Sequence, residues 1–354
     1  MRLVAYTDNV DRGGADASMS HLLARLDPAV DVTVVGVTRE IAAWVAAARS
    51  TSDTMLVPRP RSGHDWRSLR AHFDALRKIG PDILHANLSS PWSCQYAIAA
   101  AGFLRHPKIV AVYQLPRPPR SGRQLGMKRL TSRAVDRHVG VGERTSREIE
   151  GLLSLPAGSV ATIHNGVPDV PFEPVPRPRR GPLVGAIGRL EPQKGYDVLI
   201  RALAHVEEAT LVLVGEGGER PALEQLAARV GVADRVVWAG WSDDARSYLG
   251  TFDVFAFPSR FEGFPLAVLE ALLARRAVVA SDVGSTAEAV RDGETGLLVP
   301  PENPTALASA IRKLLADAQL RQRLGDQGRR LVLDRFTAGQ MARAFESLYD
   351  ELLR

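Results

Sequence analysis

This sequence of 354 residues has few or none of several features that indicate a particular class of protein. Its single cysteine, Cys94, excludes an internal disulfide framework and suits a reducing compartment. No apolar run is long enough to span a membrane, and the apolar start of the chain stops at Asp8, which is unlike a signal peptide. The absence of a short-period repeat argues against a solenoid. We therefore expect a soluble, cytoplasmic protein.

Two binding signatures are also incomplete. The glycine turn at Gly215 and Gly217 would need a third glycine to match a dinucleotide fingerprint, but Arg220 stands there. The most basic region, residues 117–137, has no aromatic side chain between its charges, so it gives no support for stacking on single-stranded nucleic acid. These gaps argue against a dinucleotide dehydrogenase and against a nucleic-acid partner.

The net charge of +5 suits anionic partners such as nucleotides, phosphates and anionic lipids. The excess is concentrated in residues 117–137, which begin with Arg117 and end with Arg137 and also contain Leu125 and Met127. One interpretation is a basic amphipathic surface that docks on the inner face of a membrane. The other is a solvated helix face with arginines in the adjoining loops.

Short apolar runs alternate with helical patterns along the whole chain, which is typical of parallel α/β sheets. In the first half the expected strands cover residues 3–7, 32–37, 54–57, 83–86, 109–113, 138–141 and 160–164. In the second half they cover residues 183–187, 210–214, 235–239, 254–257, 277–281 and 296–299. The pattern predicts two doubly wound, Rossmann-like domains that face each other across a cleft.

The domain boundary is expected at a segment rich in proline and arginine, residues 174–182, which cannot form a regular element. We predict an N-terminal domain over residues 1–173, a linker over 174–182 and a C-terminal domain over 183–336. A final helix in residues 337–354 has an apolar face that must pack on another element.

The most informative stretch is residues 259–270, a loop between an apolar strand and a helix. Pro265 suits the first helical position, and Gly263 lets the backbone come close to a ligand. Phe264 and Leu266 flank Pro265. The N-terminus of the helix presents free N–H groups and a partial positive charge, so this junction is a natural anion site.

Two carboxylates frame this junction, Glu262 in the loop and Glu270 in the helix. The neighbours of Glu270 are almost all apolar, and a buried carboxylate is costly without a polar partner. A ribose diol, with two hydroxyl donors, would be such a partner. The alternative is an ion pair with Arg275 or Arg276, which follow in the chain.

Two cationic residues follow another expected strand. Arg189 comes directly after Gly188, and Lys194 stands just before a helix. Two positive charges beside a helix N-terminus are what a diphosphate needs, because they supply both charge neutralisation and N–H donors. In the first half, Gly13 and Gly14 follow the first strand and allow close backbone approach to a ligand. His85 and Asn87 end a later strand, and Gln114 ends the next.

Together these segments resemble the retaining glycosyltransferase family 4 (glycosyl transferases group 1), which has the GT-B fold. The signature is Phe-Glu-Gly-Phe-Pro-Leu-x3-Glu at 261–270, with Gly-Arg at 188–189 and Lys-Gly at 194–195. The resemblance implies that Arg189 and Lys194 bind the donor diphosphate, that Glu262 orients the sugar and that Glu270 holds the ribose. It also implies donor contacts from two further sets, Gly14, Gly188, Gly215, Gly240 and Trp241, and Gly263, Phe264, Pro265 and Leu266.

On the acceptor side the resemblance implies contacts from Gly13, His85, Asn87 and Gln114. The family commonly has a histidine at the position of Gln114, and glutamine cannot shuttle a proton at neutral pH. A second departure is Ser285, where the family often has glycine. The final helix would return to the N-terminal domain.

The expected activity is transfer of a hexose from a nucleoside diphosphate sugar to a lipid, glycan or small metabolite, with retention at the anomeric carbon. No metal and no cofactor is expected, because the cations serve the diphosphate. The alternatives are a GT-B epimerase, or a catalytically silent nucleotide-sugar-binding subunit, which the loss of the histidine would permit. The sequence does not distinguish uridine from guanosine nucleotides.

Overall fold

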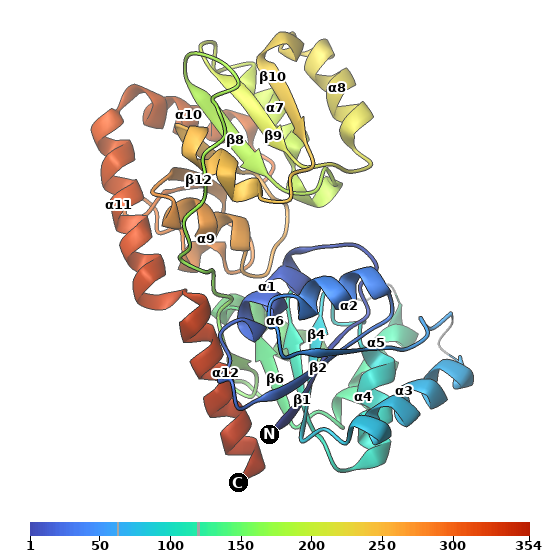
Figure 1. Ribbon diagram of the computed structural model, residues 1–354. Helices are drawn as coiled ribbons and strands as arrows, with labels where there is room; N and C mark the ends of the chain where they lie inside the picture. Colours follow the sequence, from blue (N-terminus) through green and yellow to red (C-terminus); the bar gives the residue numbers. More distant parts are fainter. Residues whose placement is uncertain (62–63, 119–120) are drawn as a thin grey trace. The chain divides into compact units, whose positions relative to one another are not determined.

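The computed structural model describes residues 1–61, 64–118 and 121–354. Contacts within the chain divide it into two compact units (Figure 1). The N-terminal unit comprises Met1–Pro168 together with Thr337–Arg354, and the C-terminal unit comprises Asp169–Phe336. The C-terminal segment thus groups with the beginning of the chain.

The N-terminal unit is built on a parallel sheet of seven strands in the order β3-β2-β1-β4-β5-β6-β7. The strands are β1 (Arg2–Thr7), β2 (Asp31–Gly36), β3 (Asp53–Leu56), β4 (Ile83–Leu88), β5 (Lys108–Tyr113), β6 (Arg137–Gly140) and β7 (Ala161–Thr162). The helices are α1 (Gly14–Leu23), α2 (Arg39–Ala46), α3 (Trp66–Ile79), α4 (Gln95–Leu104), α5 (Gly122–Ser132), α6 (Glu143–Leu153) and α12 (Ala338–Leu353). Every residue of β4 is buried, as expected for a parallel strand covered on both faces.

The C-terminal unit contains a parallel sheet of six strands in the order β10-β9-β8-β11-β12-β13. The strands are β8 (Leu183–Ile187), β9 (Thr210–Val214), β10 (Val236–Gly240), β11 (Val254–Phe257), β12 (Ala277–Ser281) and β13 (Leu297–Val299). The helices are α7 (Tyr196–Leu203), α8 (Arg220–Arg229), α9 (Leu266–Leu273), α10 (Pro304–Ala316) and α11 (Ala318–Arg335). Short 3-10 turns are η1 (Pro192–Lys194), η2 (Ala233–Arg235), η3 (Ala245–Thr251) and η4 (Thr286–Glu288).

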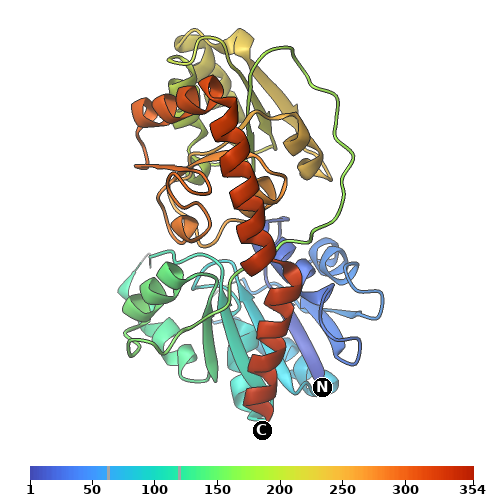
Figure 2. The ribbon, with the colours of Figure 1, turned by 90° about the vertical axis from the view of Figure 1, so that its left-hand side faces the viewer.

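The predicted class, two doubly wound α/β units, is confirmed, and each expected strand is present within two residues of its expected ends. Residues 171–182 form no helix or strand and run as a long open segment (Figure 2). One local prediction is wrong: Pro265 lies at the N-cap of α9, with extended backbone angles, and Leu266 is the first helical residue. The fixed φ of proline suits both positions, so the residue type alone could not separate them.

The final helix α12 belongs to the N-terminal unit and begins with a capping box, in which Thr337 and Gln340 satisfy each other's backbone N–H groups. Its buried face includes Met341, Phe345 and Leu348, the face that the sequence period indicates.

The basic region of residues 117–137 contains α5, which has an unusual orientation. Lys128 is only 1% exposed, whereas Met127 and Leu130 are 50% and 59% exposed. Burial lowers the pKa of the Lys128 ammonium to about 8. The helix therefore turns a lysine inward and apolar side chains outward, which neither sequence interpretation anticipated. Arg120 and the side chain of Arg123 lie outside the described residues.

Within the described ranges, no helix has both the length and the apolar character needed to traverse a lipid bilayer.

Candidate functional site

In the C-terminal unit the predicted donor-binding residues gather at one edge of the sheet. Strands β8 and β11 are neighbours at its centre, and the chain leaves them toward opposite sides, to β9 and to β12. Open α/β sheets bind ligands at such a switch point, outside the carboxyl ends of the strands. The loop after β8 carries Arg189 and Lys194, and the loop after β11 carries Glu262.

Both cations contact carboxylates. Lys194 Nζ lies 2.6 Å from Glu262 Oε1, and the Glu262 side chain is buried. Arg189 Nη1 lies 2.9 Å from Glu191 Oε1, and this pair is more exposed, with 44% of the arginine side chain accessible. The structure thus joins Lys194 and Glu262, two predicted site residues that are 68 positions apart. An incoming diphosphate would compete with these carboxylates for the cations.

Glu270 has no hydrogen-bond or ion-pair partner among the described residues, although it is partly buried in α9. The arginine alternative is wrong. Arg275 forms an ion pair with Asp326 at 3.6 Å, and Arg276 donates to backbone carbonyls of Ala274 and Phe252.

The charged form of the Glu270 carboxyl is therefore unfavourable, because the group is removed from water without a partner in the described chain. Burial raises its pKa to about 7, with Arg246 opposing the shift and Asp244 adding to it. A polar ligand with hydroxyl donors would relieve the lost hydration of this group.

The loop that carries Glu262 is braced by contacts that the sequence did not reveal. Arg260 makes a bidentate ion pair with Asp197, with distances of 2.8 and 2.9 Å. The Ser285 N–H donates to Gly263 O at 2.8 Å. A Cβ on Gly284 would lie 2.0 Å from Glu262 O, and the φ of Gly284 is +51°, so only glycine fits there. These long-range contacts fix the loop before any ligand arrives.

At three of the predicted donor-binding glycines the backbone conformation itself requires glycine. Gly188, Gly215 and Gly240 end β8, β9 and β10 with φ values of +153°, +139° and +75°. A Cβ on Gly215 would lie 2.1 Å from Gly188 O. The fold by itself therefore requires these glycines. Trp241, by contrast, is 55% exposed just after β10, where a flat nucleobase could stack on it.

The side chains around Gly263 face the interior. Phe264 is buried and meets Phe336 edge-on at 4.9 Å between ring centroids. Pro265 and Leu266 are buried as well. Donor contact from these three positions would therefore have to come from backbone groups at the start of α9, since the side chains pack in the core.

In the N-terminal unit the structure does not require glycine at the two glycine positions of the turn after β1. Gly13 is extended and Gly14 begins α1, and a Cβ added to either residue would meet nothing within 4 Å. Neither packing nor backbone angles demand glycine here. Open space beside two glycines fits the predicted close approach of a ligand to the backbone.

A chain of amide hydrogen bonds fixes Asn87 and Gln114. The Asn87 amide donates to Ala15 O at 2.9 Å, and Gln114 Nε2 donates to Asn87 Oδ1 at 3.0 Å. Gln114 Oε1 in turn accepts from Asn165 Nδ2 at 3.0 Å, and Asn165 Oδ1 accepts from Ser18 Oγ at 2.6 Å. The amide of Gln114 is thus held at both ends at the end of β5.

His85 is a packing residue. It is 2% exposed, its Nδ1 lies 2.6 Å from the Tyr349 hydroxyl, and its ring packs against Phe345. Burial lowers the pKa of the imidazole to about 3. The expectation that His85 contacts an acceptor is not retained, because its side chain ties β4 to α12.

Two carboxylates after β1 were not included among the predicted site residues. Asp8 is half-buried, accepts from the Cys94 N–H at 2.6 Å, and has a pKa raised by burial. Asp16 is buried and accepts from Thr7 Oγ1 at 2.8 Å and from Asn9, with a pKa that burial also raises. The signal available in the sequence was two acids flanking a glycine turn.

Within the described ranges, no group of three or more His, Cys, Asp or Glu side chains is arranged to hold a metal ion.

Two family models match the chain. The model described as Glycosyltransferase Family 4 matches residues 12–169, and the model described as Glycosyl transferases group 1 matches residues 181–317. The first range contains the acceptor-side candidates and Gly14, and the second contains the other donor-side candidates.

Curated relatives share about a third of their aligned residues with the chain. The lipopolysaccharide core biosynthesis glycosyltransferase LpsE of Rhizobium meliloti is 33% identical over 215 residues, which are 59% of this chain and 61% of LpsE. A D-inositol 3-phosphate glycosyltransferase of Streptomyces bingchenggensis is 31% identical over 272 residues, which are 70% of this chain and 59% of the relative. The chain thus spans about three fifths of the length of these relatives.

Solved structures agree in fold over the whole length. HepE of Anabaena in complex with UDP-glucose superposes with a TM-score of 0.87 at 20% identity, covering 99% of this chain and 100% of HepE. At 20% identity this similarity supports only the fold. Since the two family models cover both units and the fold agrees, the chain belongs to the glycosyl transferases group 1 of glycosyltransferase family 4, with the GT-B fold.

Proposed function

We propose that the protein transfers a sugar from a nucleoside diphosphate sugar to an acceptor hydroxyl. The observation that carries this proposal is the combination of Glu270, a carboxylate without a partner among the described residues, with Arg189 and Lys194 at the same edge of one sheet. A ribose diol and a diphosphate are the two groups that these residues would complement. LpsE and the D-inositol 3-phosphate relative are both named as glycosyltransferases, which supports transfer of a sugar.

In the proposed reaction the acceptor oxygen forms a bond to the anomeric carbon, and the bond from that carbon to the diphosphate oxygen breaks. The acceptor proton leaves on the departing diphosphate. Arg189 and Lys194 stabilise the negative charge that develops there, which is worth a few kcal/mol for each well-placed donor. Glu262 orients the sugar hydroxyls, and Glu270 holds the ribose.

Retention of the anomeric configuration and independence of a metal are further parts of the proposal. The two cations and the N–H groups at the start of α9 supply charge neutralisation that a metal ion supplies in other transferases. We propose that the transferred sugar is a hexose. Uridine nucleotides are the first donors to test, because UDP-glucose is bound in the HepE structure. Gly14 is proposed for the donor side, and Gly13, Asn87 and Gln114 are proposed for the acceptor side.

The acceptor is proposed to be a glycan, a lipid or a small metabolite, and a lipid would suit one feature of α5. Met127 and Leu130 are exposed near Arg129 and Arg133, an arrangement of apolar and cationic side chains that fits an anionic bilayer surface.

The test is a panel of nucleoside diphosphate sugars with purified protein. Thermal shift would identify the donor, because a ligand that binds only the folded state stabilises it by mass action. Product analysis by proton NMR would then give the anomeric configuration. We expect nucleotide release and an α-linked product from an α-linked donor, with or without a chelator. An inverted product, or activity that a chelator abolishes, would contradict retention or metal independence respectively.

A catalytically silent binder is the second candidate, favoured by Gln114. Its amide is bonded at both ends to Asn87 and Asn165, so it acts as a structural bridge where the family commonly has histidine. If a donor stabilises the protein but no transfer or hydrolysis follows with any acceptor, this candidate is correct.

The glycine turn after β1 allows a test of ligand approach without cost to folding. Replacing Gly14 by alanine should raise the free energy of unfolding by roughly 0.5–1 kcal/mol, since alanine favours the helix and meets no atom. We expect kcat/KM for transfer to fall by about 100-fold, because the added methyl displaces a substrate group. Gly151→Ala in α6, which also meets no atom, is the matched control and should leave transfer unchanged. Equal activity of the two variants would show that no substrate approaches Gly14.

A further inference from the structure

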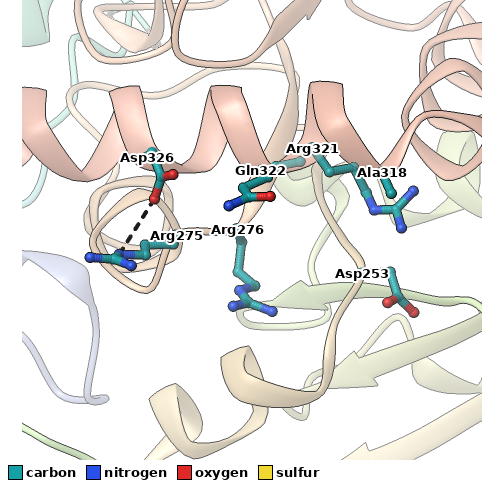
Figure 3. A pocket seen from close by; sticks show the side chains of 8 residues that line it. Asp253, Arg275, Arg276, Ala318, Arg321, Gln322 and Asp326 are labelled. Carbon is teal, nitrogen blue, oxygen red and sulfur yellow. Dashed lines mark ion pairs between the residues drawn. The ribbon is translucent and has the colours of Figure 1, made fainter.

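A second candidate site lies at the opposite edge of the C-terminal sheet. A cavity of about 300 Å³ is bounded by the residue before β11, the turn before β12 and the start of α11 (Figure 3). Its lining includes Arg275, Arg276 and Arg321 together with Asp253 and Asp326. Asp253 precedes β11 and Pro258 follows it, so the cavity and the donor-side loop lie roughly 16 Å apart along the strand. The cavity is therefore separate from the donor site.

The carboxylates of this cavity are already neutralised. Asp326 pairs with Arg275 at 3.6 Å, and Figure 3 draws this contact between α11 and the facing turn. Asp253 Oδ2 accepts from Arg177 Nη2 at 2.9 Å and from the Leu183 N–H at 2.8 Å. The two other arginines that line the cavity are Arg276 and Arg321. Neither of them makes an ion pair with a carboxylate among the described residues. The cavity thus carries two guanidinium groups that make no ion pair among the described residues. Burial lowers the pKa of Arg276, and the nearby charge of Asp253 opposes that shift.

These two guanidinium groups are held in place and keep donors free. Arg276 uses Nε and Nη1 for the carbonyls of Ala274 and Phe252, which leaves Nη2. Arg321 uses Nη1 for the carbonyls of Leu314 and Leu315 at the end of α10, which leaves Nε and Nη2. Guanidinium groups fixed in this way lose little side-chain freedom when they bind an anion.

The turn between α9 and β12 has a defined backbone conformation. Arg275 has a φ of +57°, a left-handed conformation that favours glycine. Gly325 of α11 packs so closely on this turn that a Cβ there would lie 2.3 Å from Arg275 O. The Arg276 N–H donates to Ala271 O at 2.9 Å, so the left-handed residue Arg275 closes the C-terminus of α9 and fixes where the chain turns toward β12.

We propose that this cavity binds a phosphate group, either free or carried by a small metabolite. Arginine donors in a fixed arrangement match phosphate oxygens, and the volume leaves room for more than inorganic phosphate. Inorganic phosphate and a hexose monophosphate are the probes.

The experiment is a calorimetric titration of the full chain in the background Arg189→Ala/Lys194→Ala, which removes the two cations proposed for the donor site. We expect saturable binding of at least one probe, with tighter binding of the hexose monophosphate if the ligand is a metabolite and equal binding if it is free phosphate. Arg321→Gln should weaken binding at least tenfold. Arg323→Gln, an arginine of the same helix that also donates to a carbonyl, should leave it unchanged.

A second variant guards against loss of folding. Gln322 lines the cavity and makes no hydrogen bond among the described residues, so Gln322→Glu adds a negative charge without breaking a contact. It should also weaken binding at least tenfold while the melting temperature without ligand stays the same. Failure of both probes to bind the background protein, or binding that Arg321→Gln and Gln322→Glu leave intact, would overturn the proposal.

Discussion

Replacing Arg189 and Lys194 together by alanine is expected to lower kcat/KM for sugar transfer by about 10⁴-fold. Loss of one preorganised donor at a developing oxyanion typically costs 10²–10³-fold, and both proposed diphosphate ligands are removed here. The measurement is nucleotide release at several donor concentrations. Arg201→Ala is the control, because Arg201 is an exposed arginine of α7 without a hydrogen-bond or ion-pair partner in the described chain.

The two cations differ in their effect on stability, which makes the single variants informative. Arg189 forms an exposed pair with Glu191, so Arg189→Ala should change the free energy of unfolding by less than about 1 kcal/mol. Lys194→Ala strands the buried Glu262 carboxylate and should cost about 3 kcal/mol, which the added change Glu262→Gln should partly restore. If Arg189→Ala is folded and transfers sugar at the parent rate, the role of Arg189 is wrong.

The second large effect is a dependence of stability on pH that comes from Glu270. Burial raises its folded-state pKa from the ordinary 4.5 to about 7, so the folded protein binds this proton more tightly than the unfolded chain does. Proton binding by Glu270 therefore stabilises the folded state fully below pH 4.5, and this stabilisation is lost as pH rises through 7. The total change is at most about 3 kcal/mol, from roughly 1.4 kcal/mol for each pKa unit.

Chemical denaturation of the ligand-free protein between pH 5 and pH 9 measures this change, and Glu270→Gln is the isosteric control. The difference in unfolding free energy between the two proteins isolates the Glu270 contribution from all other titrating groups. We expect the variant to become relatively more stable by 2–3 kcal/mol as pH rises through 7. A saturating nucleotide donor should reduce this difference, since ribose hydroxyls that donate to the carboxylate favour its charged form. Parallel pH curves would show that Glu270 is solvated or paired.

The candidate donor site could be located from the sequence to a large extent. The strand ends before Arg189 and before Glu262 are visible as local apolar runs, and the isolation of Glu270 in an apolar helix is visible from its neighbours alone. These features depend on residues close together in the chain, where periodicity carries the information. The structure keeps all of them at one edge of the sheet.

The sequence misled where a side chain's partner is distant in the chain. His85 meets Tyr349 of α12, 264 positions away, so a strand-end histidine that looked available is buried. Lys128, one of many cations in its segment, is directed inward, and no local pattern distinguishes it from its exposed neighbours.

By itself the sequence determined the two doubly wound units, the junction at residues 259–270 and the residue types that we propose for binding a diphosphate and a ribose. Only the tertiary structure decided which charges are paired. It directs Arg275 and Arg276 to Asp326 and to backbone carbonyls, and leaves Glu270 without either. The physical reason is that ion pairing depends on where a turn sends its side chains. The left-handed residue Arg275 closes the C-terminus of α9, and Gly325, 50 residues later in the chain, lets α11 pack closely on this turn.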